Sequence, residues 1–382
     1  MNFLTADQQF WLDTVNRFMD EEITLEYIRK CDMERAYPYE GYAKLAEAGW
    51  LRLLIPEEYG GSGGTVLDYA LMCEGLGKYG FDFAASVVVP TFTAMNIVKF
   101  GTDAQKERFL EPFMSGARRF SISISEPSAG SDAAATRTRA KREGGDYVVR
   151  GQKLWCSGAA ARDVTIAMLV RTDQEAAKHR GLSVLLVPND TPGLDIRRLP
   201  TLSRRATGTT EIFIDDARIP EENRLGAEGQ GWEIIGQNLT LERLAISAAY
   251  VGNAQTAVDA ALRYARQRVQ FDRAISEFQV IRHMLADMQT RVDAARLLVY
   301  RAAELITQGE PCEREVAMAK LFGSETLQDV TRNGMQILGG HSMLPEADME
   351  RYFREGMQCT IGGGTSQIQR TLIARSMLAS VN

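Results

Sequence analysis

A glycine-rich run near the C-terminus has the composition of an anion-binding site: Ile361-Gly362-Gly363-Gly364-Thr365-Ser366-Gln367-Ile368. Three successive glycines let a ligand approach the backbone closely, and Thr365 or Ser366 can cap a helix that begins there. Free N–H groups and the positive end of that helix would favour a phosphate group. A helix start softened by glycine explains the same residues without a ligand, so the run alone leaves both interpretations open.

A carboxylate at Glu242 could do a different kind of chemistry. In a helix, Ala245, Ile246 and Ala249 would share its face, as would Leu239, so Glu242 projects from an apolar or small-residue surface. Most glutamates are solvated surface charges. A glutamate held away from water has a raised pKa and can act as a general base on a C–H bond.

Other common signatures are missing from the sequence. No G-x-G-x-x-G opens a helix after a strand and no Walker lysine is present, so the run Gly60–Gly64 is interpreted as a connecting loop. The three histidines, His179, His283 and His341, are not at metal-ligand spacing. The five cysteines are far apart, odd in number and without a C-x-x-C pair, which predicts neither disulfides nor zinc.

The elements that position these residues follow a helix, strand, helix order. Apolar residues recur at helical spacing from Thr5 to about Ser115, and short alternating or apolar runs between turns predict strands from about 119 to 226. Three long helical stretches follow, at about 232–267, 276–308 and 313–338, and a last helix is expected after Gly364.

The fold class predicted from this order is α+β. We expect an N-terminal α-helical domain over 1–118, a middle antiparallel β-sheet or barrel domain over 119–228, and a C-terminal four-helix bundle over 229–382. A ligand would most easily bind where the three parts meet.

Composition excludes several classes of function. The chain has 382 residues, 45% hydrophobic and 25% charged, which is typical of a soluble globular protein of more than one domain. A net charge of -6 with dispersed arginines disfavours nucleic-acid binding. The N-terminus is expected to form an acidic amphipathic helix and no later stretch to approach a membrane span, so we expect a cytoplasmic protein.

Six separated motifs resemble those of the acyl-CoA dehydrogenase family and occur in the family's order. They are Ser125-Glu126-Pro127-Ser128-Ala129-Gly130-Ser131-Asp132, Gly151-Gln152-Lys153-Leu154-Trp155-Cys156-Ser157, Arg268-Val269-Gln270-Phe271-Asp272 with Phe278-Gln279, Leu285-Ala286-Asp287-Met288, Gln336-Ile337-Leu338-Gly339-Gly340, and Gly364-Thr365-Ser366-Gln367-Ile368-Gln369-Arg370. The resemblance extends from about Thr5 to Leu378. Each motif is weak alone, but six in order are specific.

The resemblance implies FAD as the cofactor. Trp155 would lie against the flavin ring, Ser157 would bind its edge near N5, and Ser125 with the backbone at Ile124 would bind the polar edge. The diphosphate and adenine half is assigned, partly across a subunit boundary, to Arg268, Phe271, Gln279, Gln336, Gly340, Thr365 and Gln367. Ser131 is assigned to both the cofactor and the pyrophosphate of coenzyme A, and the other expected substrate contacts are Arg243, Gly363 and Gly364.

The resemblance also places the catalytic base. Most of the family carries a glutamate immediately before the Gly-Thr of the last motif, but Gly363 occupies that position here. Isovaleryl-CoA and long-chain dehydrogenases take the base from an L-E-R-L context, which Leu241-Glu242-Arg243-Leu244 matches. The resemblance therefore implies that Glu242 is the base and that the backbone N–H at Gly363 polarises the thioester carbonyl.

The implied reaction is α,β-dehydrogenation of an acyl-CoA thioester by a homotetramer that passes electrons to an electron-transfer flavoprotein. Three departures from the family motifs are Ser128 and Asp272, which replace glycines, and Ser157, which replaces a threonine. Asp272 must point outward or pair with Arg268 or Arg273, because an anion opposes a diphosphate.

Three alternatives remain open from the sequence. Tyr37-Pro38 with the preceding Cys31–Glu34, and the stretch Arg263–Phe271, resemble crotonobetainyl-CoA reductase, an enoyl-CoA reductase that runs the same chemistry backward. Flavin monooxygenases and nitroalkane oxidases share the fold and react with oxygen. The third alternative is a non-enzymatic structural relative without flavin, which would purify as a colourless protein.

Overall fold

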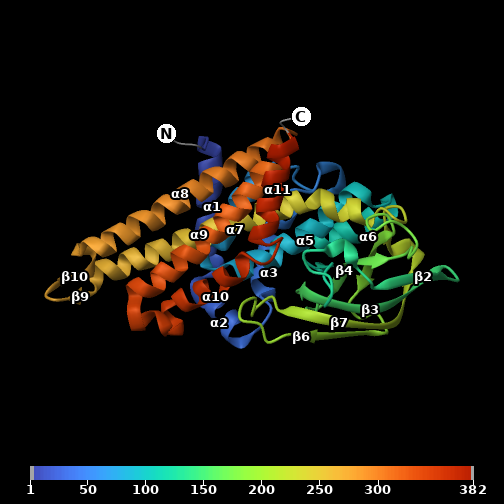
Figure 1. Cartoon of the computed structure of the whole chain (residues 1–382), viewed down its shortest axis with the longest axis horizontal. Coiled ribbons are helices and arrows are strands. Elements are labelled where there is room, and N and C mark those ends of the chain that lie inside the picture. The colour runs from blue at the N-terminus through green and yellow to red at the C-terminus, as the bar shows by residue number, and fades with distance from the viewer. Residues whose placement is uncertain (1–3, 380–382) are drawn as a thin grey trace. The chain divides into compact units, whose positions relative to one another are not determined.

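The computed structural model describes residues 4–379, except the side chain of residue 238, and it confirms the predicted order of helices, strands and helices (Figure 1). Three of the early helices begin with a capping box, in which the hydroxyl of Thr5, Thr65 or Thr102 accepts from the N–H of the third helix residue, and the threonine N–H donates to that residue's side chain. The early helices are α1 (Ala6–Phe18), α2 (Leu25–Glu34), α3 (Tyr39–Glu47), α4 (Val66–Leu76), α5 (Phe81–Phe100) and α6 (Asp103–Met114).

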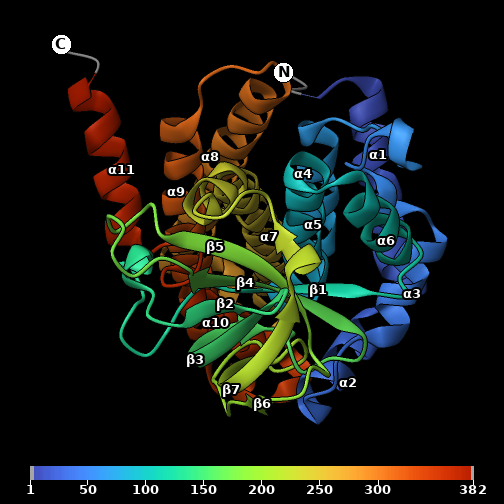
Figure 2. The same ribbon diagram turned by 90° about the vertical axis from the view of Figure 1, so that its right-hand side faces the viewer.

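The middle of the chain forms a sheet of eight strands, in the order β6-β7-β3-β2-β4-β5-β8, with β1 paired to β4 (Figure 2). The strands are β1 (Arg119–Ser123), β2 (Arg139–Glu143), β3 (Asp146–Ser157), β4 (Val164–Arg171), β5 (Leu182–Pro188), β6 (Leu194–Arg198), β7 (Thr209–Pro220) and β8 (Arg224–Leu225). The prediction of a wholly antiparallel sheet was wrong, because β1 and β2 both pair with β4 in parallel.

The strands that could be predicted from the sequence are the ones whose side chains are buried. The apolar runs of β4 and β5 are almost wholly buried and form the centre of the sheet's core. In contrast, β2 (Arg139–Glu143) is rich in charge and mostly exposed, and β6 (Leu194–Arg198) lies at the sheet edge. β2 lacks the apolar alternation of a half-buried strand, and in β6 only Leu194 and Ile196 alternate with charged residues over five positions, so both escaped prediction.

The C-terminal helices are α7 (Gly231–Gln267), α8 (Gln279–Thr307), α9 (Glu313–Leu338), α10 (Met349–Cys359) and α11 (Ser366–Ala379). Figure 1 shows α8 and α9 running side by side, and α9 also contacts α10 and α11. A two-residue hairpin of β9 (Val269–Gln270) and β10 (Arg273–Ala274) separates α7 from α8. The bundle confirms the predicted C-terminal helices and adds α10.

The chain divides into two compact units. One unit comprises Met1–Lys30, Thr65–Ala85 and Leu241–Asn382, and the other comprises Cys31–Gly64 and Ser86–Thr240. The division into 1–118, 119–228 and 229–382 stays a prediction. We refer below to the first as the bundle unit and to the second as the sheet unit.

One helix, α5, is long and apolar enough to cross a membrane by length and composition. The expectation that no stretch approaches such a span was wrong by these two measures. In its most apolar window, 89% of the residues are buried within the fold, which is typical of a core helix of a globular protein.

Candidate active site

Trp155 is the most unusual residue of the sheet unit. The pairing of β3 with β7 shifts register between Leu154 and Cys156, which leaves Trp155 at a bulge with φ +64° and 58% of its surface exposed. A bulky residue rarely adopts left-handed backbone, and an aromatic ring is rarely left so open to solvent. Strain of this kind persists where the surrounding structure enforces it, commonly at functional sites. The strand is therefore built to present an aromatic face outward.

A buried lysine connects this strand to the predicted flavin-binding loop. Lys153, fully buried beside Trp155, donates from Nζ to the Ile124 carbonyl at 3.1 Å and pairs with Glu126 at 3.0 Å. The backbone N–H of Leu154 donates to the Ser125 carbonyl at 2.9 Å. Ile124, Ser125 and Trp155 were predicted to bind the flavin, and the structure brings their backbones together.

Glu126 completes this connection. Its carboxylate accepts from the backbone N–H groups of Arg137 at 2.8 Å and Thr138 at 2.9 Å. Burial alone would raise the pKa of Glu126, but Lys153 and these hydrogen bonds outweigh it and lower that pKa below its ordinary value. An ionised Glu126 thus joins the start of β2 to the loop before it. Sequence reasoning missed Glu126 and Lys153, although both lie within the motifs it quoted.

The two serines assigned to ligands occupy different settings. Ser157 ends β3, half-buried, and its carbonyl accepts from the Ser121 hydroxyl at 2.7 Å. Within residues 4–379, the Ser157 hydroxyl itself has no hydrogen-bond partner and can bind a ligand. Ser131 is exposed in the loop before Asp132, which pairs with Lys178 at 2.5 Å.

Glu242 lies near the start of the part of α7 that belongs to the bundle unit, where it is half-buried. Ala245, Ile246 and Ala249, which share its face, are at most 4% exposed. The next residue, Arg243, donates from Nε to the Gly363 carbonyl at 3.3 Å. Burial lowers the pKa of Arg243, and the nearby Glu242 carboxylate opposes that change.

The glycine run adopts backbone that other residues avoid. Gly363 and Gly364 have φ of +65° and +86°. A Cβ atom at position 363 would lie only 2.6 Å from Cδ1 of Ile246. A side chain at position 363 would therefore have to adopt strained left-handed backbone and displace the end of the Ile246 side chain, and the glycine itself supplies no carboxylate.

Besides Arg243 of α7, side chains from two other helices hold the carbonyl groups of this loop. Gln369 of α11 donates to the carbonyls of both Gly363 and Gly364 at 3.1 Å. Lys320 of α9 donates to the Gly364 carbonyl at 2.7 Å and to the Cys359 carbonyl at 2.9 Å. Burial lowers the pKa of Lys320 to about 8. Sequence reasoning missed Lys320 and Gln369, because a buried lysine gives no pattern of its own.

The backbone N–H groups of the same loop, unlike its carbonyl groups, are available to a ligand. Within the described residues, no acceptor is within hydrogen-bond reach of the backbone N–H of Gly363, Gly364 or Thr365. Thr365 caps α11 by accepting from the N–H of Ile368 at 3.2 Å. Successive free N–H groups at left-handed glycines form an anion-binding concavity, so the fit to a phosphate or an oxyanion is good.

The residues assigned to the diphosphate and adenine fall into separate pockets of the bundle unit. Arg268 and Gly340 line one cavity of about 590 Å³, together with Tyr264, Gln270 and His341. The cation and the glycine backbone suit a phosphate there.

Thr365 and Gln367 line another cavity, of about 430 Å³, whose wall includes Glu325 and Asp329. These carboxylates pair with Arg370 at 2.8 Å and Arg291 at 2.7 Å, respectively, which reduces their repulsion toward an anion. The structure therefore brings together two pairs of the predicted residues, each pair in its own pocket.

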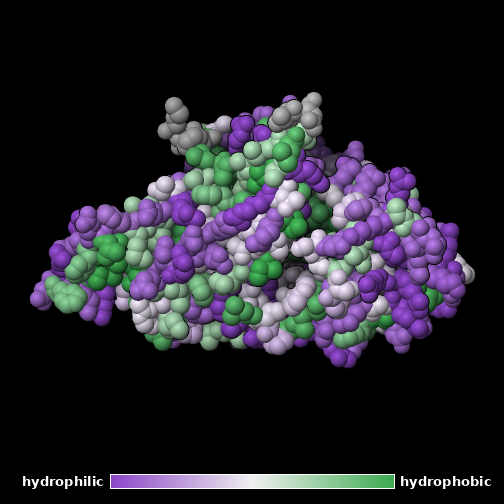
Figure 3. All heavy atoms as spheres, in the orientation of Figure 1, coloured by the Kyte–Doolittle hydropathy of each residue, from purple (hydrophilic) through white to green (hydrophobic). Residues whose placement is uncertain are grey.

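The remaining assigned residues lie outside the lining of those cavities. Phe271 is 88% exposed at the tip of the β9–β10 hairpin, and Gln279 and Gln336 are exposed on α8 and α9. Figure 3 shows an apolar patch over this hairpin end, where Val269 and Val280 are also exposed. Asp272 is exposed in the same turn, as expected if it points away from a diphosphate.

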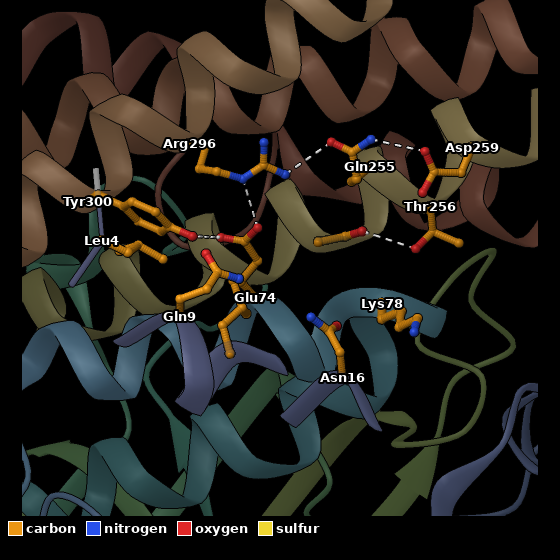
Figure 4. A pocket seen from close by; sticks show the side chains of 12 residues that line it. Leu4, Gln9, Asn16, Glu74, Lys78, Gln255, Thr256, Asp259, Arg296 and Tyr300 are labelled. Atoms are coloured by element: carbon orange, nitrogen blue, oxygen red, sulfur yellow. Dashed lines mark hydrogen bonds and ion pairs between the residues drawn. The ribbon is translucent and has the colours of Figure 1, made fainter. Parts of the chain in front are cut away.

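A further cavity of about 520 Å³ in the bundle unit contains none of the predicted site residues (Figure 4). There the buried Glu74 accepts from Arg296 at 2.9 Å and from the Tyr300 hydroxyl at 2.8 Å, and Arg296 also donates to Gln255 at 3.1 Å. Because these polar groups satisfy one another, the network joins α4, α7 and α8 without a ligand.

Three family models match successive parts of the chain. They are described as the acyl-CoA dehydrogenase N-terminal domain (residues 5–117), middle domain (121–217) and C-terminal domain (229–378). The chain belongs to the acyl-CoA dehydrogenase family. It is therefore an FAD-dependent oxidoreductase, which rejects the flavin-free alternative.

Individual relatives match this chain over nearly its whole length. The probable acyl-CoA dehydrogenase YngJ of Bacillus subtilis is 39% identical, covering 99% of this chain and 100% of that protein. The solved structure of butyryl-CoA dehydrogenase from Megasphaera elsdenii matches with a TM-score of 0.93 and 31% identity, over 99% of this chain and 100% of that chain. A structure reported as the electron transferring flavoprotein of Acidaminococcus fermentans matches at 0.94 and 34%, with the same coverage. These findings do not favour the reductase or monooxygenase alternatives.

Proposed function

We propose that this member of the family removes the α-proton and the β-hydride of an acyl-CoA thioester, with Glu242 as the base. The observation that carries the assignment is the glycine at position 363, the family's usual base position, where a left-handed φ of +65° disfavours any side chain. Glu242 lies one helical turn before Ile246 on the same face of α7. The helix that fills the usual site thus offers a carboxylate in its place.

FAD, when bound, supplies the electron acceptor for the β-hydride. In the sheet unit, Trp155, Ser157 and the Ile124–Ser125 backbone would hold its ring. In the bundle unit, Arg268 and Gly340 offer a cation and open backbone for phosphate, as do the N–H groups at Thr365. The assignments of Phe271, Gln279, Gln336 and Gln367 to the cofactor remain part of the proposal.

The base takes the α-proton directly from the substrate. A carboxylate of ordinary pKa is a weak base toward carbon, so exclusion of water by the bound substrate must raise the pKa of Glu242. Arg243 follows Glu242 in the chain and is held in place by its bond to the Gly363 carbonyl. This arrangement keeps the base and the glycine loop in a fixed relation.

The loop acidifies the α-proton by polarising the thioester carbonyl. The N–H groups of Gly363 and Gly364 are free to donate to the carbonyl oxygen, where negative charge develops as the proton leaves. The Gly363 carbonyl already accepts from Arg243 and Gln369, which polarises the peptide group that ends in the Gly364 N–H. The absence of side chains at Gly362 and Gly363 favours a branched or bulky acyl group.

We further propose a cytoplasmic homotetramer that donates its electrons to an electron-transfer flavoprotein. Exposed apolar residues on α8, α9 and α11 support self-association: Val280, Leu297, Met318, Met377 and Leu378. All five cysteines are buried and free, in keeping with a reducing compartment. The similarity to the Acidaminococcus electron transferring flavoprotein structure supports the redox partner.

The test is anaerobic titration of the yellow protein with a panel of acyl-CoA esters, in the wild type and in Glu242→Gln. We expect substrate to bleach the wild-type flavin, and the variant to keep FAD but lose about 10²- to 10⁴-fold in rate, as for other general bases. An unchanged rate in Glu242→Gln would remove the mechanism. The neighbouring Glu233→Gln, an exposed acid on the same helix, is the matched control.

A further inference from the structure

Asn253 is a buried amide on the helix that carries the proposed base. It lies on α7, in the bundle unit, and none of its surface is exposed. Within the described residues, neither the oxygen nor the nitrogen of its side chain has a hydrogen-bond partner. Buried polar side chains are nearly always hydrogen-bonded, because they otherwise lose their hydration without compensation. An amide in which both atoms are open thus points to a ligand.

The position of Asn253 on α7 connects it to Glu242. Ile246, Ala249 and Asn253 follow Glu242 at spacings that place all four residues on one face of the helix. Burial increases along this face: Glu242 is half-buried, Ile246 is 4% exposed, and Ala249 and Asn253 are completely buried. An apolar acyl chain that starts beside Glu242 is stabilised by leaving water, so we expect it to extend toward the buried end of this face.

Two contacts of α7 place Asn253 between α4 and the start of α5. Gly252 packs so closely on α4 that a Cβ atom there would lie 1.9 Å from the Glu74 carbonyl oxygen. On the other side, the rings of Tyr250 and Phe81 meet edge-on, with centroids 4.7 Å apart. Around the surface of α7, Asn253 comes between Gly252 and Tyr250, so its amide faces the angle between α4 and α5.

The side chains beside this angle are small. Ala249 precedes Asn253 by one turn of α7, and Ala84 and Ala85 follow Phe81 by one turn of α5. All three alanines are at most 1% exposed, so this surface is shielded from bulk water. Methyl groups along two helices offer an apolar surface to a hydrocarbon chain, and the amide of Asn253 adds a polar group at its end.

We propose that Asn253 binds a neutral polar group at the far end of the acyl chain, so that the preferred substrates carry a distal hydroxyl. This inference rests on the proposed function, because the acyl chain must begin beside Glu242. A hydroxyl both donates and accepts, so it can pair with either atom of the Asn253 amide. An amide offers no charge to balance a buried carboxylate, and we therefore expect the distal group to be neutral.

The length of the helix between the two residues limits which acyl groups reach this contact. From Glu242 to Asn253 the helix axis rises about 16 Å, at about 1.5 Å per residue. An acyl chain must span roughly that distance from its α-carbon to place a hydroxyl beside Asn253. Short acyl groups cannot make the contact, so the preference for a hydroxyl should appear only in longer chains.

The first test compares acyl-CoA esters of increasing chain length, each with and without a terminal hydroxyl. For the wild type, we expect kcat/KM to favour the hydroxylated ester about tenfold at the fitting length, because a plain chain leaves the buried amide unpaired. Asn253→Leu, of similar volume, should abolish or reverse that preference. Thr256→Val is the matched control on the same helix: its hydroxyl donates to the Gly252 carbonyl at 3.2 Å, and the preference should persist.

Two further measurements separate a substrate contact from a role in the core. Asn253→Leu removes two unpaired polar atoms, so the Tm of the FAD-loaded protein without substrate should stay the same or rise. Ala249→Val puts a larger side chain one turn before Asn253, so it should shorten the longest acyl chain that the enzyme accepts. A lower Tm for Asn253→Leu together with an unchanged hydroxyl preference would overturn the inference.

Calorimetric titration of the same ester pairs into FAD-loaded Glu242→Gln needs no turnover. We expect the hydroxylated ester to bind more tightly, and Glu242→Gln with Asn253→Leu to lose that difference. Bleaching of the wild type with equal kcat/KM for both members of every pair would overturn the role of Asn253 and leave the proposed reaction standing. A binding preference without bleaching by any ester would instead uphold the contact with Asn253 and reject the proposed reaction.

Discussion

Replacement of Lys320 by methionine should separate catalysis from stability. The Lys320 ammonium is buried, and its pKa falls from an ordinary 10.5 to about 8, so keeping it charged below pH 8 costs about 3 kcal/mol. Methionine of similar length removes that cost. It also removes two charged hydrogen bonds, to the carbonyls of Gly364 and Cys359, each of which contributes about 1.5–3 kcal/mol.

These effects oppose each other and are similar in size, so we expect the melting temperature of Lys320→Met to change by only a few degrees. The glycine loop, however, loses its shortest restraint, since the Gly364 carbonyl keeps only Gln369 at 3.1 Å. Misplacement of an oxyanion donor by about 1 Å lowers kcat by roughly 10²-fold. The assay is steady-state turnover beside thermal unfolding and FAD content. Lys44→Met, a surface lysine paired with Glu40, is the control.

A kcat within twofold of the wild type, or a loss of turnover that only follows loss of FAD, would refute this role for Lys320. Lys320→Gln keeps an N–H donor without the charge, so partial recovery of kcat would show that loop geometry is the cause. The depressed pKa of Lys320 also fixes the direction in which stability changes with pH. The unfolded chain binds the extra proton between pH 8 and 10.5, so wild-type stability relative to Lys320→Met should rise across that window.

Three further predictions follow from single contacts. Arg268→Ala should retain less FAD after gel filtration, because its pocket loses the cation, and full occupancy would contradict the phosphate assignment. Trp155→Gly should leave the FAD-free protein at least as resistant to urea, since it relieves left-handed strain of about 1–3 kcal/mol, yet should weaken flavin binding. In Glu242→Gln, adding Gly363→Glu should not restore turnover unless Ile246→Ala also makes room for the new side chain, and recovery with Ile246 intact would show that the loop yields.

Periodicity predicted the elements whose apolar faces are buried and missed those without such faces. The long helices α8 and α9 and the buried strands β4 and β5 carry strong patterns, so their positions followed from the sequence. The parallel pairing of β1 with β4 could not be predicted, because the partner of a strand depends on contacts between distant segments.

The candidate site shows the same division. Motif spacing placed Trp155 and Ser125 in one site, and the hydrogen bond from Leu154 to Ser125 explains why those motifs lie together. Lys153, Lys320 and Gln369 were missed as functional residues, because a side chain that binds backbone carbonyls leaves no periodic signal. Their roles depend on which loop a distant segment of chain brings within hydrogen-bond distance.

One loop in each unit is held in the same way, which argues that the buried lysines are not incidental. In the sheet unit, Lys153 binds the Ile124 carbonyl of a loop assigned to the flavin. In the bundle unit, Lys320 binds the Gly364 carbonyl of a loop assigned to the thioester. In each case a fully buried ammonium group faces the carbonyl side of a peptide chain. That arrangement fixes the loop and leaves its other N–H groups for the ligand. Burying an ammonium group costs desolvation free energy, and a loop that must keep one conformation for its ligand gives a reason to retain it.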